Sequence, residues 1–208
     1  MGNNLIKFDP YMSRIICLQE YADPQQIGTV YFVKHKAGSN IAPNEISKNT
    51  HYGLAIDITG SSTKRTFCAT HYDLCIEKPT NHFTYIDCEF KERPWDYYYE
   101  VREIGKIPSN EIQKFYVPSY FAEDLRFKLI NNVHYAMSMK NQGTKWSSML
   151  NCQTFTRAAI QYLGFDFPSD IIIVSDCLPS MVDIYMSSRL TTAYVKEQKT
   201  ELKEKFSN

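Results

Sequence analysis

HYGLAIDI, residues 51–58, is the stretch that decides the fold. Its apolar and β-branched residues run up to a turn signal at residues 59–62, and this pattern predicts a β-strand. Residues 65–76, RTFCATHYDLCI, resume the strand pattern after the turn, so the two stretches predict an antiparallel hairpin. Three further strands are predicted, at residues 28–33, 83–90 and 97–104.

Helices are predicted mainly in the second half of the chain. Asn151 is a favourable N-cap residue and Gly164 is a favourable residue just beyond a helix. We therefore expect a helix that begins at Cys152 and ends before Gly164. The other elements predicted after residue 105 are helices at 111–116, 119–137 and 179–190 and a short strand or extended segment at 171–174.

The predicted elements form a single domain over residues 1–208, because a chain of this length can bury one full core. The core is expected within about residues 28–190, and the charged residues 191–208 are expected to form a terminal helix or tail. The predicted fold class is α+β, with an antiparallel sheet packed against a helix that has Cys152 at its N-terminus.

Charge and hydropathy restrict the partners and the location. Lys and Arg total 23 and Asp and Glu total 23, so nothing electrostatic favours a nucleic-acid partner. The N-terminus has no hydrophobic signal core, and no apolar stretch is long enough to cross a bilayer. We therefore expect a cytoplasmic protein without a transmembrane segment or a cofactor. Its six cysteines are expected to be free thiols: Cys17, Cys68, Cys75, Cys88, Cys152 and Cys177.

Cys152 is the predicted nucleophile. Cysteine reacts as the thiolate, which a helix N-terminus and a nearby imidazole both favour. The backbone N–H groups of the opening turn, including those of Gln153 and Thr154, offer hydrogen bonds to an anion, and the Cys152 N–H is expected in an oxyanion hole. We assign Asn151 and Gln153 to oxyanion or substrate binding.

A histidine must supply the base, and His51 is the predicted one. It opens a strand and is followed by Gly53, a small residue that permits close approach of another backbone or of a substrate. If the hairpin turn is centred near Ser61, His71 lies opposite His51 and orients it or replaces it. Three alternatives to His71 in the third catalytic role stay open: Asp57, His82 and Asp87.

Other kinds of site are less consistent with the sequence. Cys68, His71, Cys75 and Cys88 are close together in the sequence and suggest zinc as an alternative. On a strand, however, Cys68 and His71 point to opposite faces, so we predict no metal site. The chain has neither a Gly-x-Ser-x-Gly nucleophile elbow nor a phosphate-binding Gly-x4-Gly-Lys loop.

Two short motifs carry a resemblance to a known group. Residues 51–56, HYGLAI, resemble the histidine-bearing strand of the circularly permuted papain-like cysteine hydrolases, and residues 151–155, NCQTF, resemble their cysteine box. That group includes lecithin:retinol acyltransferase-like proteins, NlpC-type amidases and PPPDE thiol isopeptidases. The histidine precedes the cysteine by about a hundred residues, as in the permuted members. The resemblance spans roughly residues 28–180 and implies a permuted papain-like fold.

Two branches of the group match different features. The cysteine box, Leu163-Gly164 and the later Pro168-Ser169 and Leu178-Pro179 resemble the PPPDE proteins. The HYGLAI strand followed by His71 resembles the acyltransferases, although residues 51–71 exceed that hairpin in length and the branch's C-terminal membrane anchor is not found. A glycine-rich strand of the PPPDE type is also not found after His51.

The resemblance implies a cysteine-dependent acyl hydrolase that cleaves an amide, isopeptide or thioester bond through a Cys–His dyad or triad and an acyl-enzyme. Its substrate is expected to be an acylated or isopeptide-linked protein, a peptide or a lipid. Two alternatives stay open: a lipid acyltransferase of the same group, and an inactive binding or scaffold module on this fold.

Overall fold

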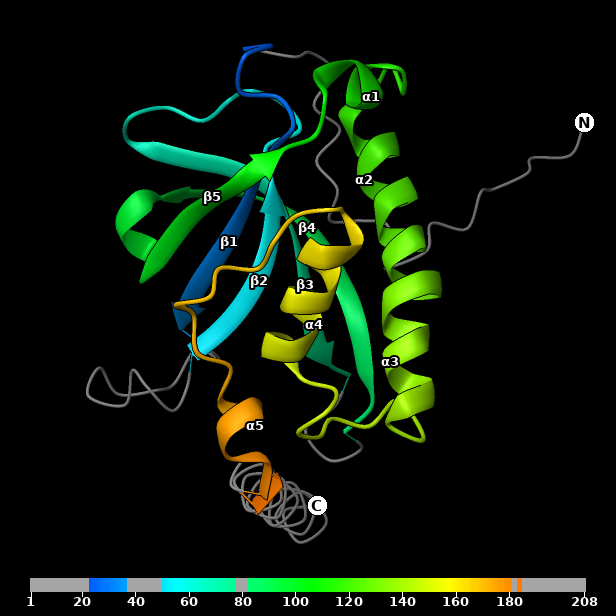
Figure 1. Cartoon of the computed structure of the whole chain (residues 1–208). Helices are drawn as coiled ribbons and strands as arrows, with labels where there is room; N and C mark the ends of the chain where they lie inside the picture. Colours follow the sequence, from blue (N-terminus) through cyan, green and yellow to red (C-terminus); the bar gives the residue numbers. More distant parts are fainter. Residues whose placement is uncertain (1–22, 37–49, 78–81, 181–182, 185–208) are drawn as a thin grey trace, which may run out of the picture.

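The computed structural model describes residues 23–36, 50–77, 82–180 and 183–184. Five strands form one antiparallel sheet, in the order β4-β3-β2-β1-β5 (Figure 1). The strands are β1 Thr29–Lys36, β2 Thr50–Ile56, β3 Thr66–Ile76, β4 Thr84–Pro94 and β5 Glu100–Lys106. All five lie where the sequence predicts strands, and the α+β class is confirmed.

Helices follow the last strand. They are α1 Ser109–Gln113, α2 Pro118–Lys128, a π-helical turn Leu129–His134, α3 Tyr135–Lys140, α4 Cys152–Tyr162 and α5 Val174–Cys177. A short 3₁₀ helix, Trp95–Tyr97, connects β4 to β5. The helix predicted over 119–137 is therefore one helical stretch over 118–140 with a π-helical turn inside it. The predicted tail at 191–208, and most of the predicted helix at 179–190, lie outside the described residues.

The helices pack on one face of the sheet. Because side chains alternate along a strand, Leu54 and Tyr72 face the helices, where they belong to the same buried cluster as Phe155 of α4. Figure 1 shows α4 lying over β2 and β3, with the stretch from α2 to α3 beside it. The opposite face of the sheet has a smaller cluster that includes Ala55 and Phe67, beside Tyr98 of the segment that follows the 3₁₀ helix.

The start of α4 is fixed by local hydrogen bonds. Asn151 has an extended backbone, and its side-chain oxygen accepts hydrogen bonds from the N–H groups of Gln153 and Thr154. The Thr154 hydroxyl is in turn an acceptor for the Asn151 N–H, which completes a capping box. The predicted helix start at Cys152 is confirmed, and the cap sets the position of that residue at the end of the sheet.

None of the helices in the described ranges is long and apolar enough to cross a membrane. The apolar residues of α4 instead pack against the sheet, where Phe155, Ala159 and Ile160 are fully buried.

Replacing Phe155 with alanine tests the role of α4 in the core. The side chain is 0% exposed, so Phe155→Ala should reduce the free energy of unfolding by about 3–5 kcal/mol. Phe127→Ala is the matched control, because Phe127 is 64% exposed and its loss should change stability by less than about 0.5 kcal/mol. Urea denaturation followed by circular dichroism measures both. Similar losses in the two variants would contradict the packing of α4 on the sheet.

Candidate active site

Cys152 lies at the first turn of α4, where its side chain is directed to the end of the sheet. The residue is buried, with 6% of its surface exposed. It is a free thiol, as are the other cysteines that the structure describes. Cys152 is close enough to His51 for their side chains to form a hydrogen bond. The structure thus brings together the two residues that the sequence predicts as nucleophile and base.

The cap of α4 changes which groups can bind an anion. Of the four N–H groups that open a helix without an intrahelical partner, those of Asn151, Gln153 and Thr154 are taken up by the capping box. The expectation that the Gln153 and Thr154 N–H groups serve an anion is therefore wrong. Within the described hydrogen bonds, the N–H of Cys152 is the one that the cap leaves for a substrate oxygen.

Asn151 and Gln153 both use their side chains to hold the local structure. The Asn151 amide donates to the carbonyls of Ser147 and Ser148 at 3.0 and 2.9 Å. The Gln153 side-chain oxygen accepts the N–H of Val174 at 2.8 Å and so fixes the start of α5 beside α4. These hydrogen bonds give both side chains a structural role. Their predicted part in oxyanion or substrate binding stays a prediction.

His51, the second residue of β2, is held on two sides. Its Nε2–H donates to Oδ1 of Asp73 at 3.2 Å, so Nδ1 is the ring nitrogen left to face Cys152. Burial by itself lowers the pKa of His51, but the Cys152 thiolate and the bond to Asp73 outweigh burial and raise that pKa to about 10. His51 is therefore suited to the protonated, imidazolium form.

Asp73 is the site residue that the sequence analysis missed. It lies on β3 and is buried, with Oδ1 toward His51 and Oδ2 accepting from the Lys91 ammonium at 2.8 Å. Burial alone would raise the pKa of Asp73, yet Lys91 and His51 together lower it well below the usual value. The carboxylate is therefore ionised and orients the imidazole.

The predicted register of the hairpin is wrong. His71 pairs with Ala55 rather than with His51, because the hairpin is centred on Thr63, midway between the paired Leu54 and Tyr72, rather than near Ser61. Asp57 organises that connection by accepting the N–H groups of Thr59 at 3.1 Å and Gly60 at 2.7 Å. The observed register differs from the predicted one by an even number of residues, so His71 and Asp73 still lie on the same face of the sheet as His51. On that face, Asp73 rather than His71 is the β3 side chain that meets His51.

His71 lies deeper on that face and contacts an aromatic partner instead. Its Nε2 is 2.9 Å from the Tyr98 hydroxyl, and the two rings stack at a centroid distance of 5.6 Å. Burial, followed by the charge of Lys91, lowers the pKa of His71 well below its usual value, so the ring is neutral. His71 therefore belongs to the buried structure beside the site.

The alternatives for the third role also lie elsewhere. Asp57 accepts hydrogen bonds within the turn after β2. Asp87 lies on β4, where it is the strand partner of Asp73. His82 precedes β4 with a left-handed backbone (φ 63°), and its carbonyl accepts the N–H of Trp146. Among the described hydrogen bonds, it is Asp73 that meets His51.

The zinc alternative fails on geometry. Cys88 lies in the helix-side cluster across from Tyr72, whereas His71 is on the opposite face of the sheet. Within the described part of the chain, Cys68, His71, Cys75 and Cys88 do not gather as potential metal ligands.

Gly53 makes the approach of Asp73 possible. A Cβ atom at position 53 would lie 2.3 Å from Oδ1 of Asp73 and 3.1 Å from Cγ2 of Val33. Position 53 is closely approached, but by the side-chain carboxylate of the next strand rather than by the backbone or substrate that the sequence analysis expects. The alternation His71-x-Asp73 was the available signal, because residues two apart on a strand share a face.

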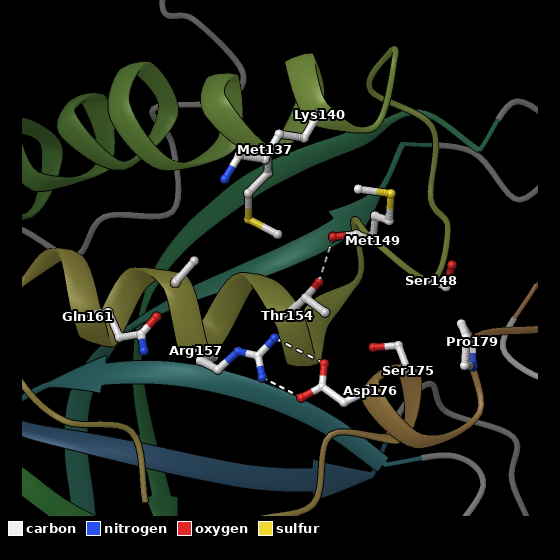
Figure 2. Close-up of a pocket in the computed structure, with 11 residues that line it drawn as sticks. Met137, Lys140, Ser148, Met149, Thr154, Arg157, Gln161, Ser175, Asp176 and Pro179 are labelled. Carbon is white, nitrogen blue, oxygen red and sulfur yellow. Dashed lines mark hydrogen bonds and ion pairs between the residues drawn. The ribbon is translucent and has the colours of Figure 1, made fainter.

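A cavity of about 370 Å³ lies on the outer side of α4 (Figure 2). Its α4 lining, which includes Thr154 and Gln161, is on the side of the helix turned away from Phe155 and the sheet. Arg157 and Asp176 pair across one side of it. Neither Cys152 nor His51 lines this cavity, so it is separate from that pair.

Comparison with known proteins gives no relative. No protein-family model matches the chain, and no curated protein or solved structure matches it.

Gly53→Ala tests the contact between β2 and the Asp73 carboxylate. The added methyl group should displace that carboxylate and reduce the free energy of unfolding by about 1–3 kcal/mol. In an Asp73→Ala background the same substitution should cost clearly less, because the clashing oxygen is gone. A double-mutant cycle by urea denaturation measures the difference. Equal costs in the two backgrounds would show that Asp73 does not lie against position 53.

Proposed function

We propose that this protein is a cysteine-dependent acyl hydrolase in which Cys152 is the nucleophile, His51 the acid–base residue and Asp73 the residue that orients His51. The observation that carries the proposal is the chain of contacts from Cys152 to His51 to Asp73. A nucleophile, a base within hydrogen-bond reach and a third group that orients the base together form the general signature of covalent acyl transfer.

The arrangement supports a permuted papain-like interpretation of the fold. A helix begins at the cysteine, packs on an antiparallel sheet and meets a histidine from a strand earlier in the chain. The acid–base residue uses Nδ1 toward sulfur and Nε2 toward its orienting partner, which keeps the ring fixed while a proton is exchanged on the sulfur side.

The reaction begins with attack of the Cys152 thiolate on a carbonyl carbon. The carbonyl π electrons move to oxygen, and the resulting oxyanion accepts a hydrogen bond from the Cys152 N–H at the positive end of α4. Collapse of this intermediate breaks the bond to the leaving amine, alcohol or thiol, which takes the proton held by His51. A thioester acyl-enzyme remains.

Hydrolysis returns the enzyme to its starting state. Neutral His51 takes a proton from water as the water oxygen attacks the thioester, and the second tetrahedral intermediate expels Cys152 as a thiolate. The acyl group leaves as a carboxylic acid. Attack by another acceptor in place of water would give acyl transfer from the same acyl-enzyme.

Charges around the site support an ion pair between Cys152 and His51. The imidazolium lies between the Cys152 thiolate and the Asp73 carboxylate, and Lys91 offsets the carboxylate from the other side. Two positive and two negative groups therefore alternate, which reduces the cost of burying each charge. Without Lys91, the buried Asp73 would be less readily ionised.

The thiol chemistry can be tested before a substrate is known. At neutral pH, iodoacetamide should alkylate Cys152 faster than Cys177, although Cys177 is exposed and Cys152 is 6% exposed. The reason is that Cys152 lies at a helix N-terminus beside an imidazole, the surroundings in which cysteines react most readily. His51→Ala should slow alkylation of Cys152 by ~10-fold or more and leave Cys177 unchanged. Mass spectrometry of the two cysteine peptides over time gives both rates.

Activity assays complete this test. Cys152→Ala and His51→Ala should each abolish hydrolysis of thioester or isopeptide substrates, and the double variant should be little worse than either, because nucleophile and base act as a unit. Cys177→Ser is the matched control. Turnover by Cys152→Ala equal to that of the wild type, or faster alkylation of Cys177, would favour a binding module over an enzyme.

Asp73→Asn tests the orienting role. The amide keeps the shape of the side chain but removes its charge, so kcat should fall by ~10-fold or more. The alkaline limb of kcat/KM should also move to lower pH, because the carboxylate favours protonated His51. Asp87→Asn is the control, since Asp87 faces Asp73 from β4 and His51 instead contacts Asp73. An unchanged pH profile in Asp73→Asn would remove Asp73 from the mechanism.

A further inference from the structure

We propose that His35, His51 and Asp73 form a binding site for a zinc-class divalent cation, and that the bound metal holds the Cys152–His51 pair inactive. The first observation is geometric. One nitrogen from each imidazole and one oxygen from the carboxylate all lie within 4.8 Å of one another. The proposed metal site does not depend on the proposed function, whereas the inhibitory effect of the metal rests on that function.

His35 brings the ligand that the catalytic scheme does not use. It lies on β1 directly across from His51, and the two rings are 4.9 Å apart between centroids. Its Nδ1–H donates to the Lys36 carbonyl at 3.0 Å, which leaves Nε2 as a lone-pair donor. That Nε2 is buried and has no hydrogen-bond partner among the described residues.

Two of the three ligands, His35 and Asp73, are held by a second contact, as in known metal sites. The Lys36 carbonyl fixes the tautomer of His35, and Lys91 occupies Oδ2 of Asp73, so that Oδ1 remains on the His51 side. A histidine that donates its other N–H to a backbone carbonyl is the usual arrangement of a zinc ligand. The unpartnered Nε2 of His35 is thereby explained as a ligand atom.

The donor set selects the metal. Two imidazoles and one carboxylate suit zinc and its neighbours in the transition series, whereas magnesium and calcium prefer oxygen ligands. Three protein ligands leave one tetrahedral position for water. The nearby Lys91 opposes a dication, so the site is expected to bind zinc reversibly.

Bound metal would stop the proposed reaction through His51. A metal on Nε2 takes the place of the proton that this nitrogen donates to Asp73. With the metal on Nε2, the ring no longer carries the second proton that makes it an imidazolium. The metal also fixes the orientation of the ring. Zinc therefore competes directly with the protonated form of His51 that the acyl chemistry needs.

The binding test uses the Cys152→Ala protein, which removes the thiol beside His51 as a competing ligand. Zn²⁺ is titrated in competition with a chromogenic chelator, and Co²⁺ is added to a second sample to record the visible bands of a tetrahedral site. One equivalent should bind. His35→Ala and His35→Gln in this background should weaken zinc binding by ~10-fold or more, and circular dichroism checks that both fold.

Two further variants make the result specific. His82→Asn removes a histidine outside the cluster and should leave zinc affinity unchanged, with asparagine tolerating the left-handed backbone there. Lys91→Met removes the opposing charge and should tighten zinc binding, a gain that a purely structural role of Lys91 does not predict. Unchanged affinity in both His35 variants would overturn the site.

Inhibition is measured on the wild-type protein. Zn²⁺ should suppress hydrolysis and the alkylation of Cys152, a chelator should restore both, and His35→Gln should be less sensitive to the metal than the wild type. Zinc that binds through His35 but leaves Cys152 alkylation unchanged would overturn the inhibitory role. An inactive wild type would instead count against the proposed hydrolase, because zinc binding in Cys152→Ala is measured without any activity.

Discussion

The site depends on one close contact, between the Asp73 carboxylate and the backbone of Gly53. Glycine is required there because a Cβ atom would lie 2.3 Å from the carboxylate oxygen. The contact lets a buried acidic side chain on β3 reach the histidine at the start of β2. The same carboxylate binds Lys91 of β4, so a single side chain connects three neighbouring strands. Burial of that charge is tolerable because both of its oxygens have charged partners.

A second constraint places the thiol against this cluster. The Asn151 cap satisfies the donors that follow Cys152 and fixes where α4 begins. The Tyr52 hydroxyl donates to the Ile172 carbonyl, and the Val174 N–H donates to Gln153, so the segment leading into α5 is bound to both the sheet and the helix. Cys152 is therefore positioned by the cap, the strand and the following segment, and each is independent of the thiol itself.

Local sequence was a good guide wherever structure depends on neighbours in the chain. The capped start of α4 and the five strands follow from residue types and their spacing. The pairing of Cys152 with His51 could also be predicted, because thiol chemistry needs a base and the strand histidine was the best candidate. The π-helical turn inside 118–140 had no recognised signal in the sequence.

The sequence by itself determined the elements and the two principal groups of the site, because caps, turns and alternation act over a few residues. Only the tertiary structure decided which residue orients His51. That choice depends on the register between β2 and β3, which the Asp57 turn sets four residues away from the predicted pairing. The place of His35 beside His51 likewise follows from pairing between β1 and β2, which are separated in the chain. Contacts across strands are determined by register and packing together, and neither is encoded in any one segment.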